Sequence, residues 1–235
     1  MLLAINSSTL QYGLALLNME GVVIVEDIVF KGKANFGDLM PLMHSLFQRA
    51  GIQSADLKCV TVAVGPGSFT GLRVGLSLAK GLCYSLKRPL IGVSSLEAMA
   101  SQIPYSKYQI VPLLDSRKGE YFTALFNWYD NGTVRRKSQD TCLKISEFSS
   151  FIQEPSIFVG NNFMSQGVAL REIIGDKAHM APANLWNLRA SAVGWLGLKR
   201  FRNLDFDDPM TLTPLYQRGP DIRRNPCPSL TSTDR

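Results

Sequence analysis

Two stretches of the sequence, 109 residues apart, repeat one pattern of apolar and polar residues. Residues 5–18 read INSSTLQYGLALLN and residues 114–127 read LDSRKGEYFTALFN. They align without a gap, and each predicts a strand, a polar turn and a second strand. The elements expected after each stretch also follow a similar order, which indicates a decayed internal duplication and two related α/β lobes. The alternative is a chance similarity between two amphipathic hairpins.

The first copy predicts an N-terminal lobe over residues 1–103. We expect strands at 2–6, 11–18, 22–30, 59–64 and 90–93, and helices at 38–50, 70–86 and 94–101, in the order βββαβαβα. The C-terminal lobe, 104–216, is expected to be similar. It has a third strand at 134–137, a strand at 157–160, and helices at 145–151, 166–174 and 184–202. Residues 217–235 are rich in proline and poor in apolar side chains, so a disordered tail is expected.

The composition indicates a globular protein of the cytoplasm. The 235 residues are 46% hydrophobic and carry a formal net charge of +6. No apolar run is long enough to cross a bilayer, and the N-terminus lacks the basic residues of a secretory signal. Four scattered cysteines and two histidines argue against a disulfide framework and against a metal site built from imidazoles.

Residues 65–82, GPGSFTGLRVGLSLAKGL, lead from a glycine-rich loop into a predicted helix that contains further glycines. A Walker-type phosphate loop needs a lysine followed by Ser or Thr, and none is present. The dinucleotide fingerprint also fails, because Thr70 takes the place of its third glycine. A nonstandard anion site at the helix N-terminus remains open.

Close packing explains the helical glycines better than phosphate binding does. Each interior glycine costs a helix roughly 0.8–1 kcal/mol relative to alanine. Gly71, Gly75 and Ala79 share one face, and such a ridge lets another backbone approach closely. That backbone could belong to the same lobe or to an external partner. Val74, Leu78 and Leu82 can supply the apolar stripe that packs on the sheet. We therefore expect the ridge of small residues to face a partner.

The helix expected at 38–50 also has two apolar faces. Met40, His44 and Phe47, at i, i+4 and i+7, form a second semi-apolar face, which would need a further surface to cover it. The two helices together predict a partner interface made of Met40, His44, Phe47, Gly71, Gly75, Leu78, Ala79 and Leu82.

These motifs resemble the bacterial TsaB (YeaZ) family. The segment VAVGPGSFTGLRVGLSLAKGL is similar to the family signature, LLAINSST to its opening strand and turn, and LLDSRKGEYFTALF to the hairpin of its second domain. PLYQR at 214–218 resembles its C-terminal P-x-Y-x-R. The resemblance covers nearly the whole chain before the tail.

The resemblance implies the duplicated, ribonuclease H-like fold of actin, Hsp70 and sugar kinases. It implies a non-catalytic subunit of the assembly that places threonylcarbamoyl on the adenosine next to the anticodon of tRNA. The implied partners are the catalytic TsaD, which would dock on the two helices, and the ATPase TsaE. It also implies a homodimer through the same surface when the chain is alone, and tRNA contact only through the complex. ATP or ADP would be bound, if at all, at the partner interface.

Within this superfold, an Asp after the first strand usually organises metal and phosphate. Asn6 stands there, and Asp115 is its counterpart in the second copy. Asn6 and Asp115 are therefore the candidate nucleotide-binding residues, although an amide binds a hard cation weakly, which argues against such a role for Asn6. The alternative function is an ATP-dependent phosphotransferase or hydrolase using the cleft between the lobes. Direct tRNA binding through the basic clusters at 135–137 or 199–202 is a third hypothesis.

Overall fold

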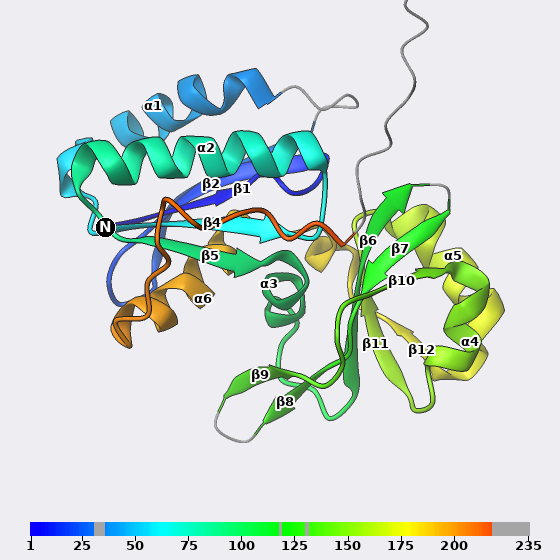
Figure 1. The fold of residues 1–235 in the computed structure, drawn as a ribbon. Coiled ribbons are helices and arrows are strands. Elements are labelled where there is room, and N and C mark those ends of the chain that lie inside the picture. Colours follow the sequence, from blue (N-terminus) through cyan, green and yellow to red (C-terminus); the bar gives the residue numbers. More distant parts are fainter. Residues whose placement is uncertain (31–35, 118, 130–131, 218–235) are drawn as a thin grey trace, which may run out of the picture.

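The computed structural model describes residues 1–30, 36–117, 119–129 and 132–217, which form two adjoining lobes (Figure 1). Five strands have the same order in both lobes, β3-β2-β1-β4-β5 in the first and β10-β7-β6-β11-β12 in the second. This repetition confirms the duplicated α/β fold. The expected tail lies outside the described residues, apart from Gln217.

The sheet of the first lobe is built around a fully buried strand. Its strands are β1 (Leu2–Asn6), β2 (Gln11–Leu17), β3 (Val23–Phe30), β4 (Cys59–Gly65) and β5 (Leu90–Ser94). Strand β1 pairs antiparallel with β2 and parallel with β4. Both of its faces are covered, which explains the uninterrupted apolar run at the start of the chain.

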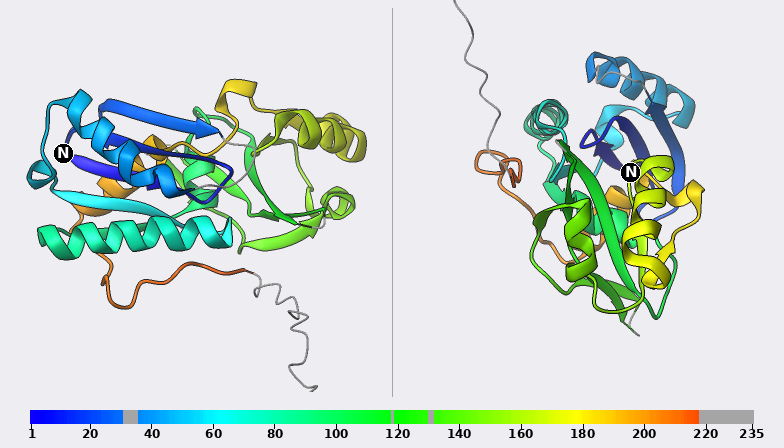
Figure 2. Two further views of the ribbon diagram at one scale, coloured as in Figure 1. Left: turned by 90° about the horizontal axis from the view of Figure 1, so that it is seen from above. Right: turned by 90° about the vertical axis from the view of Figure 1, so that its right-hand side faces the viewer.

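Helices α1 (Leu39–Ala50) and α2 (Phe69–Leu86) lie side by side on one face of this sheet (Figures 1 and 2). Helix α1 covers β2 and β3, and α2 covers β4. Their inner side chains join Leu3 and Ile5 of β1 in one core. The hydroxyl oxygen of Ser68 caps α2 by accepting the amide of Gly71 at 3.3 Å. Both helices match the expected ranges within one residue.

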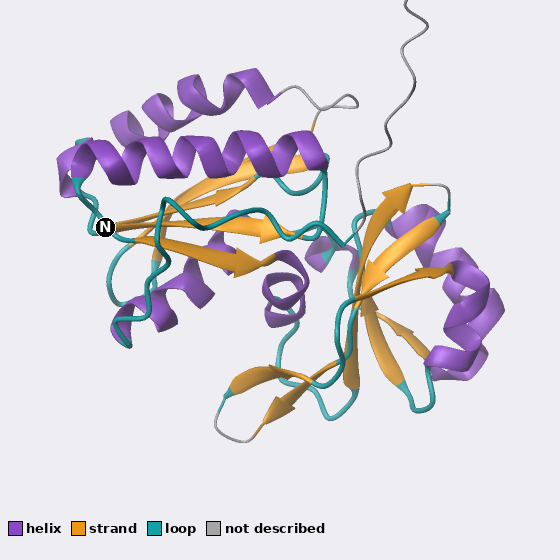
Figure 3. Cartoon of the chain, viewed as in Figure 1, coloured by secondary structure: helices purple, strands orange, loops and turns teal. Residues whose placement is uncertain are grey.

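The second lobe repeats this plan. Its strands are β6 (Gln109–Arg117), β7 (Glu120–Thr123), β10 (Thr141–Lys144), β11 (Ser156–Val159) and β12 (Ala178–Met180). Helices α4 (Phe148–Phe151) and α5 (Phe163–Ile174) cover its outer face (Figure 3). Phe148 and Leu170 of these helices share a core with Val111 and Leu113 of β6. Helix α3 (Ser95–Ser101) lies between the lobes and packs on β6.

Two extra strands distinguish the second lobe from a simple copy. Strands β8 (Phe126–Tyr129) and β9 (Thr133–Arg136) form a hairpin that joins β6 through a single pairing. The strand expected at 134–137 is therefore β9, and the third strand of the repeat is β10. The gapless alignment is also wrong by one residue after the turn. Ala4 pairs with Ala15, whereas its counterpart Leu113 pairs with Thr123.

The end of the chain returns to the first lobe. Helix α6 (Ala190–Arg202) packs on the sheet face opposite α1 and α2, where Ala190 and Leu198 meet Leu2 of β1. Residues 203–217 then pass β5, and the amide of Asp207 donates to the carbonyl of Leu90 at 2.9 Å. The expected lobe of 104–216 thus ends earlier, because residues 190–217 pack on the first lobe. The helix expected from 184 begins at Ala190, since Asn187 has a left-handed backbone (φ 72°).

The glycine face of α2 rests on its own sheet. Gly71, Gly75 and Ala79 are buried, and the Ser7 hydroxyl donates to the carbonyl of Gly71 at 2.8 Å. A Cβ at Gly75 would collide with that hydroxyl and lie 3.3 Å from the Cβ of Ser7. The interpretation of this ridge as an external docking surface was therefore wrong. Val74, expected to face the sheet, is half-buried and packs against the margin of the core.

We predict that Gly75→Ala lowers the free energy of unfolding by about 1–3 kcal/mol, because the new methyl group overfills the contact with Ser7. Urea unfolding monitored by circular dichroism measures this value. Gly81→Ala in the same helix is the matched control, since a Cβ there meets nothing within 4 Å. The control should gain roughly 0.5–1 kcal/mol. Equal effects of the two substitutions would contradict the packing described.

Candidate functional site

The predicted interface residues divide into an inward and an outward group. The inward group is buried in the first lobe and consists of Phe47, Gly71, Gly75 and Ala79. Phe47 is 9% exposed and belongs to the same core as Met43 one turn earlier. The outward group comprises Met40 and His44, which are exposed, and Leu78 and Leu82, which are half-buried. Only this outward group is available to a partner of the folded lobe.

Two exposed side chains of α1, Met40 and His44, lie on the flank of the helix that faces away from β3. Arg49 forms an ion pair with Asp27 of β3, the edge strand, so that flank of the helix points away from α2. Met40, 56% exposed, and His44 lie on the opposite flank by helical geometry. Helices α1 and α2 lie on the same side of the sheet (Figure 2), so the outward residues of both helices belong to that side of the lobe.

The outer face of α2 carries its own ridge of small residues. Ser77, Gly81 and Ser85 recur at every fourth position and are all exposed. The half-buried Val74 and Leu78 border this ridge. Sequence reasoning missed it, although its spacing is visible, because periodicity alone does not tell which of two small faces meets the sheet.

The C-terminal segment covers the first turn of α2. The amide of Leu215 donates to the carbonyl of Val64 at 2.7 Å, and the ring of Tyr216 packs on Phe69 with centroids 5.0 Å apart. Arg73 completes this cluster. Its Nε donates to the Tyr216 hydroxyl at 2.9 Å, and its guanidinium carbon lies 3.9 Å from the centre of the Phe69 ring. The segment that resembles P-x-Y-x-R thus fixes a cation on the outside of α2.

Asn6 is fully buried and its side chain is occupied by the chain itself. Its Nδ2 donates to the carbonyl of Leu188 at 2.8 Å and to that of Gln11 at 3.4 Å. Its Oδ1 accepts the amide of Ser8 at 3.1 Å and the Ser8 hydroxyl at 2.8 Å. A carboxylate could not make the two donated bonds. The amide therefore ties the first loop to the segment before α6.

The loops that would surround a phosphate in this lobe pack on each other. The amide of Ser68 donates to the carbonyl of Ser8 at 2.7 Å, and a Cβ at Gly67 would collide with the same carbonyl. Ser68 also caps the helix by accepting the amide of Gly71. An anion at the N-terminus of α2 would have to displace these contacts.

Asp115, the counterpart of Asn6, belongs to a hydrogen-bonded cluster in the second lobe. The side-chain nitrogen of Gln166 donates to Asp115 Oδ1 and to Asn161 Oδ1, both at 2.8 Å. Asn161 Nδ2 donates to Asp115 Oδ2 at 3.1 Å. Gln166 is fully buried and accepts the backbone amides of Asn161 and Asn162. Asp115 is thus oriented by α5, and nothing in the sequence singled out Gln166.

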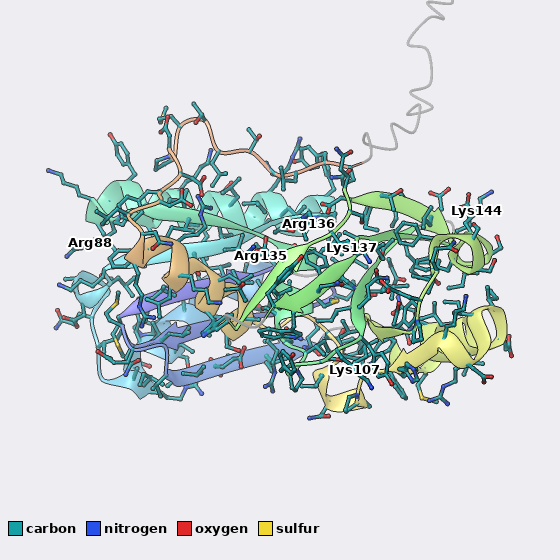
Figure 4. All side chains as sticks on the ribbon, turned by 90° about the horizontal axis from the view of Figure 1, so that it is seen from below. Arg88, Lys107, Arg135, Arg136, Lys137 and Lys144 are labelled. Carbon is teal, nitrogen blue, oxygen red and sulfur yellow. The ribbon has the colours of Figure 1, made fainter. Side chains whose placement is uncertain are left out.

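The basic residues of the lower face are spread along it (Figure 4). The figure labels Arg88, Lys107, Arg135, Arg136, Lys137 and Lys144. Arg136 pairs with Asp140 and also donates to Ser94 at 3.1 Å. Lys137 pairs with Glu154 at 2.6 Å. The charges of this cluster are partly neutralised within the chain.

The second basic cluster, at 199–202, also forms its contacts within the chain. Arg200 pairs with Asp205 at 2.7 Å and with Asp207 at 3.0 Å, and it donates to the carbonyl of Gly92 at 2.7 Å. Lys199 lies 3.6 Å from the centre of the Trp195 ring. Neither basic cluster forms an open stripe of free cations of the kind that binds RNA backbones.

Within the described residues, no group of three or more His, Cys, Asp or Glu side chains could hold a metal ion. His179 stacks on Tyr108 with centroids 4.7 Å apart. Burial raises the pKa of the Cys83 thiol to about 12, which makes it an inert core group. No helix in the described ranges has the length and apolar character needed to cross a bilayer.

Comparison with known proteins settles the family. A Bacillus subtilis protein named tRNA threonylcarbamoyladenosine biosynthesis protein TsaB is 33% identical over 220 residues, which cover 92% of this chain and 93% of that protein. The chain belongs to the TsaB family. The Escherichia coli TsaB is 31% identical over 109 residues, or 45% of this chain and 47% of that protein. A sequence profile described as TsaD, tRNA N6-adenosine threonylcarbamoyltransferase, matches residues 35–193.

Solved structures share the fold of this TsaB-family chain. Two Pseudomonas aeruginosa structures, one described as YeaZ and one as similar to peptidase YeaZ, superpose with TM-scores of 0.72 and 0.76. Their identities are 20% and 21%, and they cover 91% and 92% of this chain and 99% of each of those chains. The ethanolamine utilization protein EutJ from Carboxydothermus hydrogenoformans superposes with a TM-score of 0.54 at 10% identity. The match covers 82% of this chain and 89% of that chain. With the repeated sheet, these likenesses confirm the expected duplicated α/β fold.

We predict that Asn6→Asp destabilises the protein by about 2 kcal/mol at neutral pH, because a buried carboxylate would face the carbonyl of Leu188. The pKa of that carboxyl would rise above its unfolded value of roughly 3.9. The folded state would then bind more protons, so the loss should be small at pH 4 and grow toward pH 7. Chemical unfolding at both pH values measures it. A variant as stable as wild type at neutral pH would contradict the structural role of Asn6.

Proposed function

We propose that this chain is a non-catalytic subunit required for threonylcarbamoylation of the adenosine next to the anticodon of tRNA. It acts by binding and activating TsaD through the outer faces of α1 and α2. The relatives named TsaB support the pathway, because the Bacillus subtilis protein matches along nearly its whole length. The profile named for TsaD, which covers residues 35–193, supports a structural kinship with that enzyme.

The outer side of α1 and α2 is the observation that carries the proposal. The inner faces of both helices are buried in their own lobe. The outer side presents the exposed Met40 and the small ridge of Ser77, Gly81 and Ser85. Small exposed residues beside apolar ones allow another helix to pack closely, and a solvated helix does not need them. This arrangement favours a docking surface for helices.

The internal contacts of Asn6 and of the loop after β1 support a non-catalytic role for this chain. Asn6 uses its side chain for internal hydrogen bonds, and Ser8 is in direct contact with the loop before α2. These internal contacts lie at the position expected to hold phosphate and metal in this superfold, which supports the proposal. The proposed activity therefore lies in TsaD, and this chain contributes a surface.

The proposal includes the wider set of partners. TsaD is the direct partner and TsaE a further member of the assembly, and tRNA is reached only through the complex. Alone, the chain pairs with itself through the same helices. ATP or ADP, where present, binds at the partner interface. The proposed location is the cytoplasm.

The alternative, an ATP-dependent phosphotransferase or hydrolase, depends on Asp115 in the cleft. We predict that the purified chain shows no sustained ATP hydrolysis, because both carboxylate oxygens of Asp115 are held by Asn161 and Gln166. A coupled phosphate-release assay measures it. Turnover that disappears in Asp115→Ala would favour the enzyme.

We predict that Gly81→Gln weakens binding to TsaD about tenfold or more, because a long uncharged side chain would fill the outer ridge. The fold should be retained, since a Cβ at Gly81 meets nothing within 4 Å. Calorimetric titration with the TsaD encoded in the same genome measures the affinity. Substitution of Gly75 would not serve, because it disturbs the packing of α2 on Ser7.

Val168→Gln is the matched control for this experiment. Val168 is 57% exposed on α5, in the other lobe. Its substitution should leave the affinity for TsaD unchanged. Equal affinity of wild type and Gly81→Gln would remove the ridge from the interface.

A further inference from the structure

We infer that the partner surface that meets α2 is acidic and places a carboxylate against Arg73. Charge therefore makes this face prefer a foreign partner over a second copy of the same chain. The inference rests on the proposed function, because it names the chemistry of the partner that docks there. It is carried by the side chains around Arg73 and by the charges of the two helices.

Arg73 is an exposed guanidinium held in one orientation. The Phe69 ring lies 3.9 Å from its central carbon, and its Nε is bonded to the Tyr216 hydroxyl at 2.9 Å. Among the described residues, no carboxylate bonds to it. Its two terminal nitrogens therefore keep their hydrogen-bonding capacity toward solvent. A guanidinium fixed in this way loses little conformational freedom when it binds a carboxylate through two parallel bonds.

The docking helices carry positive charges and no negative ones. Neither α1 nor α2 contains an Asp or Glu. Lys80 lies two turns after Arg73 on the same flank of α2. The remaining cation of the pair, Arg49 of α1, is neutralised by Asp27. The unbalanced charge of the outer side is thus positive, and it belongs to α2.

This distribution disfavours a second copy. In a two-fold dimer through these helices, each copy presents the same surface to the other. The positive flank of α2 would then join an interface in which neither copy offers a carboxylate from α1 or α2 to compensate. Like charges at an interface are an effective device against a wrong partner. An acidic partner gains from the same charges.

A nucleic acid is a weaker candidate for this face. Phe69 packs against Tyr216 and Arg73, so its ring is already engaged within the chain. Two cations, Arg73 and Lys80, would neutralise only about two phosphates, which supplies little of the affinity that RNA binding requires. A protein carboxylate matches the fixed, fork-shaped guanidinium better.

The test compares the salt dependence of two associations of the full chain. Its affinity for TsaD is measured by calorimetry, and its self-association by sedimentation, between about 0.05 M and about 0.5 M NaCl. Binding to TsaD should weaken as salt rises, because attraction is screened. Self-association should strengthen, because repulsion is screened. The same dependence in both, or none, would overturn the inference.

Variants of the cluster sharpen this test. Arg73→Ala should weaken TsaD binding about 30-fold, and Tyr216→Phe, which removes one hydrogen bond, about 5-fold. Arg73→Glu should weaken TsaD binding further. It should also strengthen the association of the variant with the wild-type chain, because the two surfaces then carry opposite charges. Arg202→Ala is the control, since that arginine lies on α6 and donates to Met19. Unchanged affinity in Arg73→Ala would overturn the inference.

The carboxylate can also be captured. In Arg73→Lys, a zero-length carbodiimide should join the new amine to an Asp or Glu of bound TsaD as an amide, which peptide mapping identifies. A cross-link to another copy of the chain would contradict the inference of an acidic protein partner. Protection of the new lysine from reaction by tRNA alone would also contradict it. If wild type fails to bind TsaD at all, the proposed function fails. If Gly81→Gln disrupts binding and the Arg73 variants do not, only this inference fails.

Discussion

Helix α2 lies directly on the loop that follows β1, because glycine at its inner face leaves room for Ser7. The hydroxyl of Ser7 bonds to the helix backbone at Gly71, and no Cβ fits at Gly75. The next residue, Ser8, bonds to Ser68 before the helix. These contacts bring the helix close to the sheet and join the loop after β1 to the loop before α2. Gly71 and Gly75, which weaken the helix, serve its own lobe, whereas Gly81 lies exposed on the outer face.

The C-terminal part of the chain connects the second lobe to the first. Helix α6 crosses to the far side of the first sheet, and the following segment reaches the start of α2. There the ring of Tyr216 packs against Phe69, and its hydroxyl accepts a hydrogen bond from Arg73. A core shared by both lobes includes Met99 of α3, Phe126 of β8 and Val193 of α6. The lobes therefore act as one support for the outer faces of α1 and α2.

The sequence predicted the local features of this fold and missed its nonlocal ones. The repeat, the ranges of α1 and α2 and the unusual Asn6 could all be recognised, because each depends on neighbouring residues or on a short pattern. The faces of α2 were assigned the wrong way round, since Gly75 and Gly81 look alike until the sheet is placed. Phe47 was expected outside and is buried for the same reason. The return of α6 and the role of Tyr216 depend on contacts between distant segments, which periodicity does not contain.

Thiol labelling of the two faces of α2 tests the central claim most directly. Cys83 lies on the inner face, 2% exposed, and Ser77→Cys would place a thiol on the outer face. Labelling of each position is followed by peptide mass spectrometry, with and without TsaD. The account predicts that Cys83 stays unlabelled in both states, and that the thiol at position 77 reacts rapidly alone and slowly in the complex. Rapid labelling of native Cys83 that TsaD suppresses would contradict it.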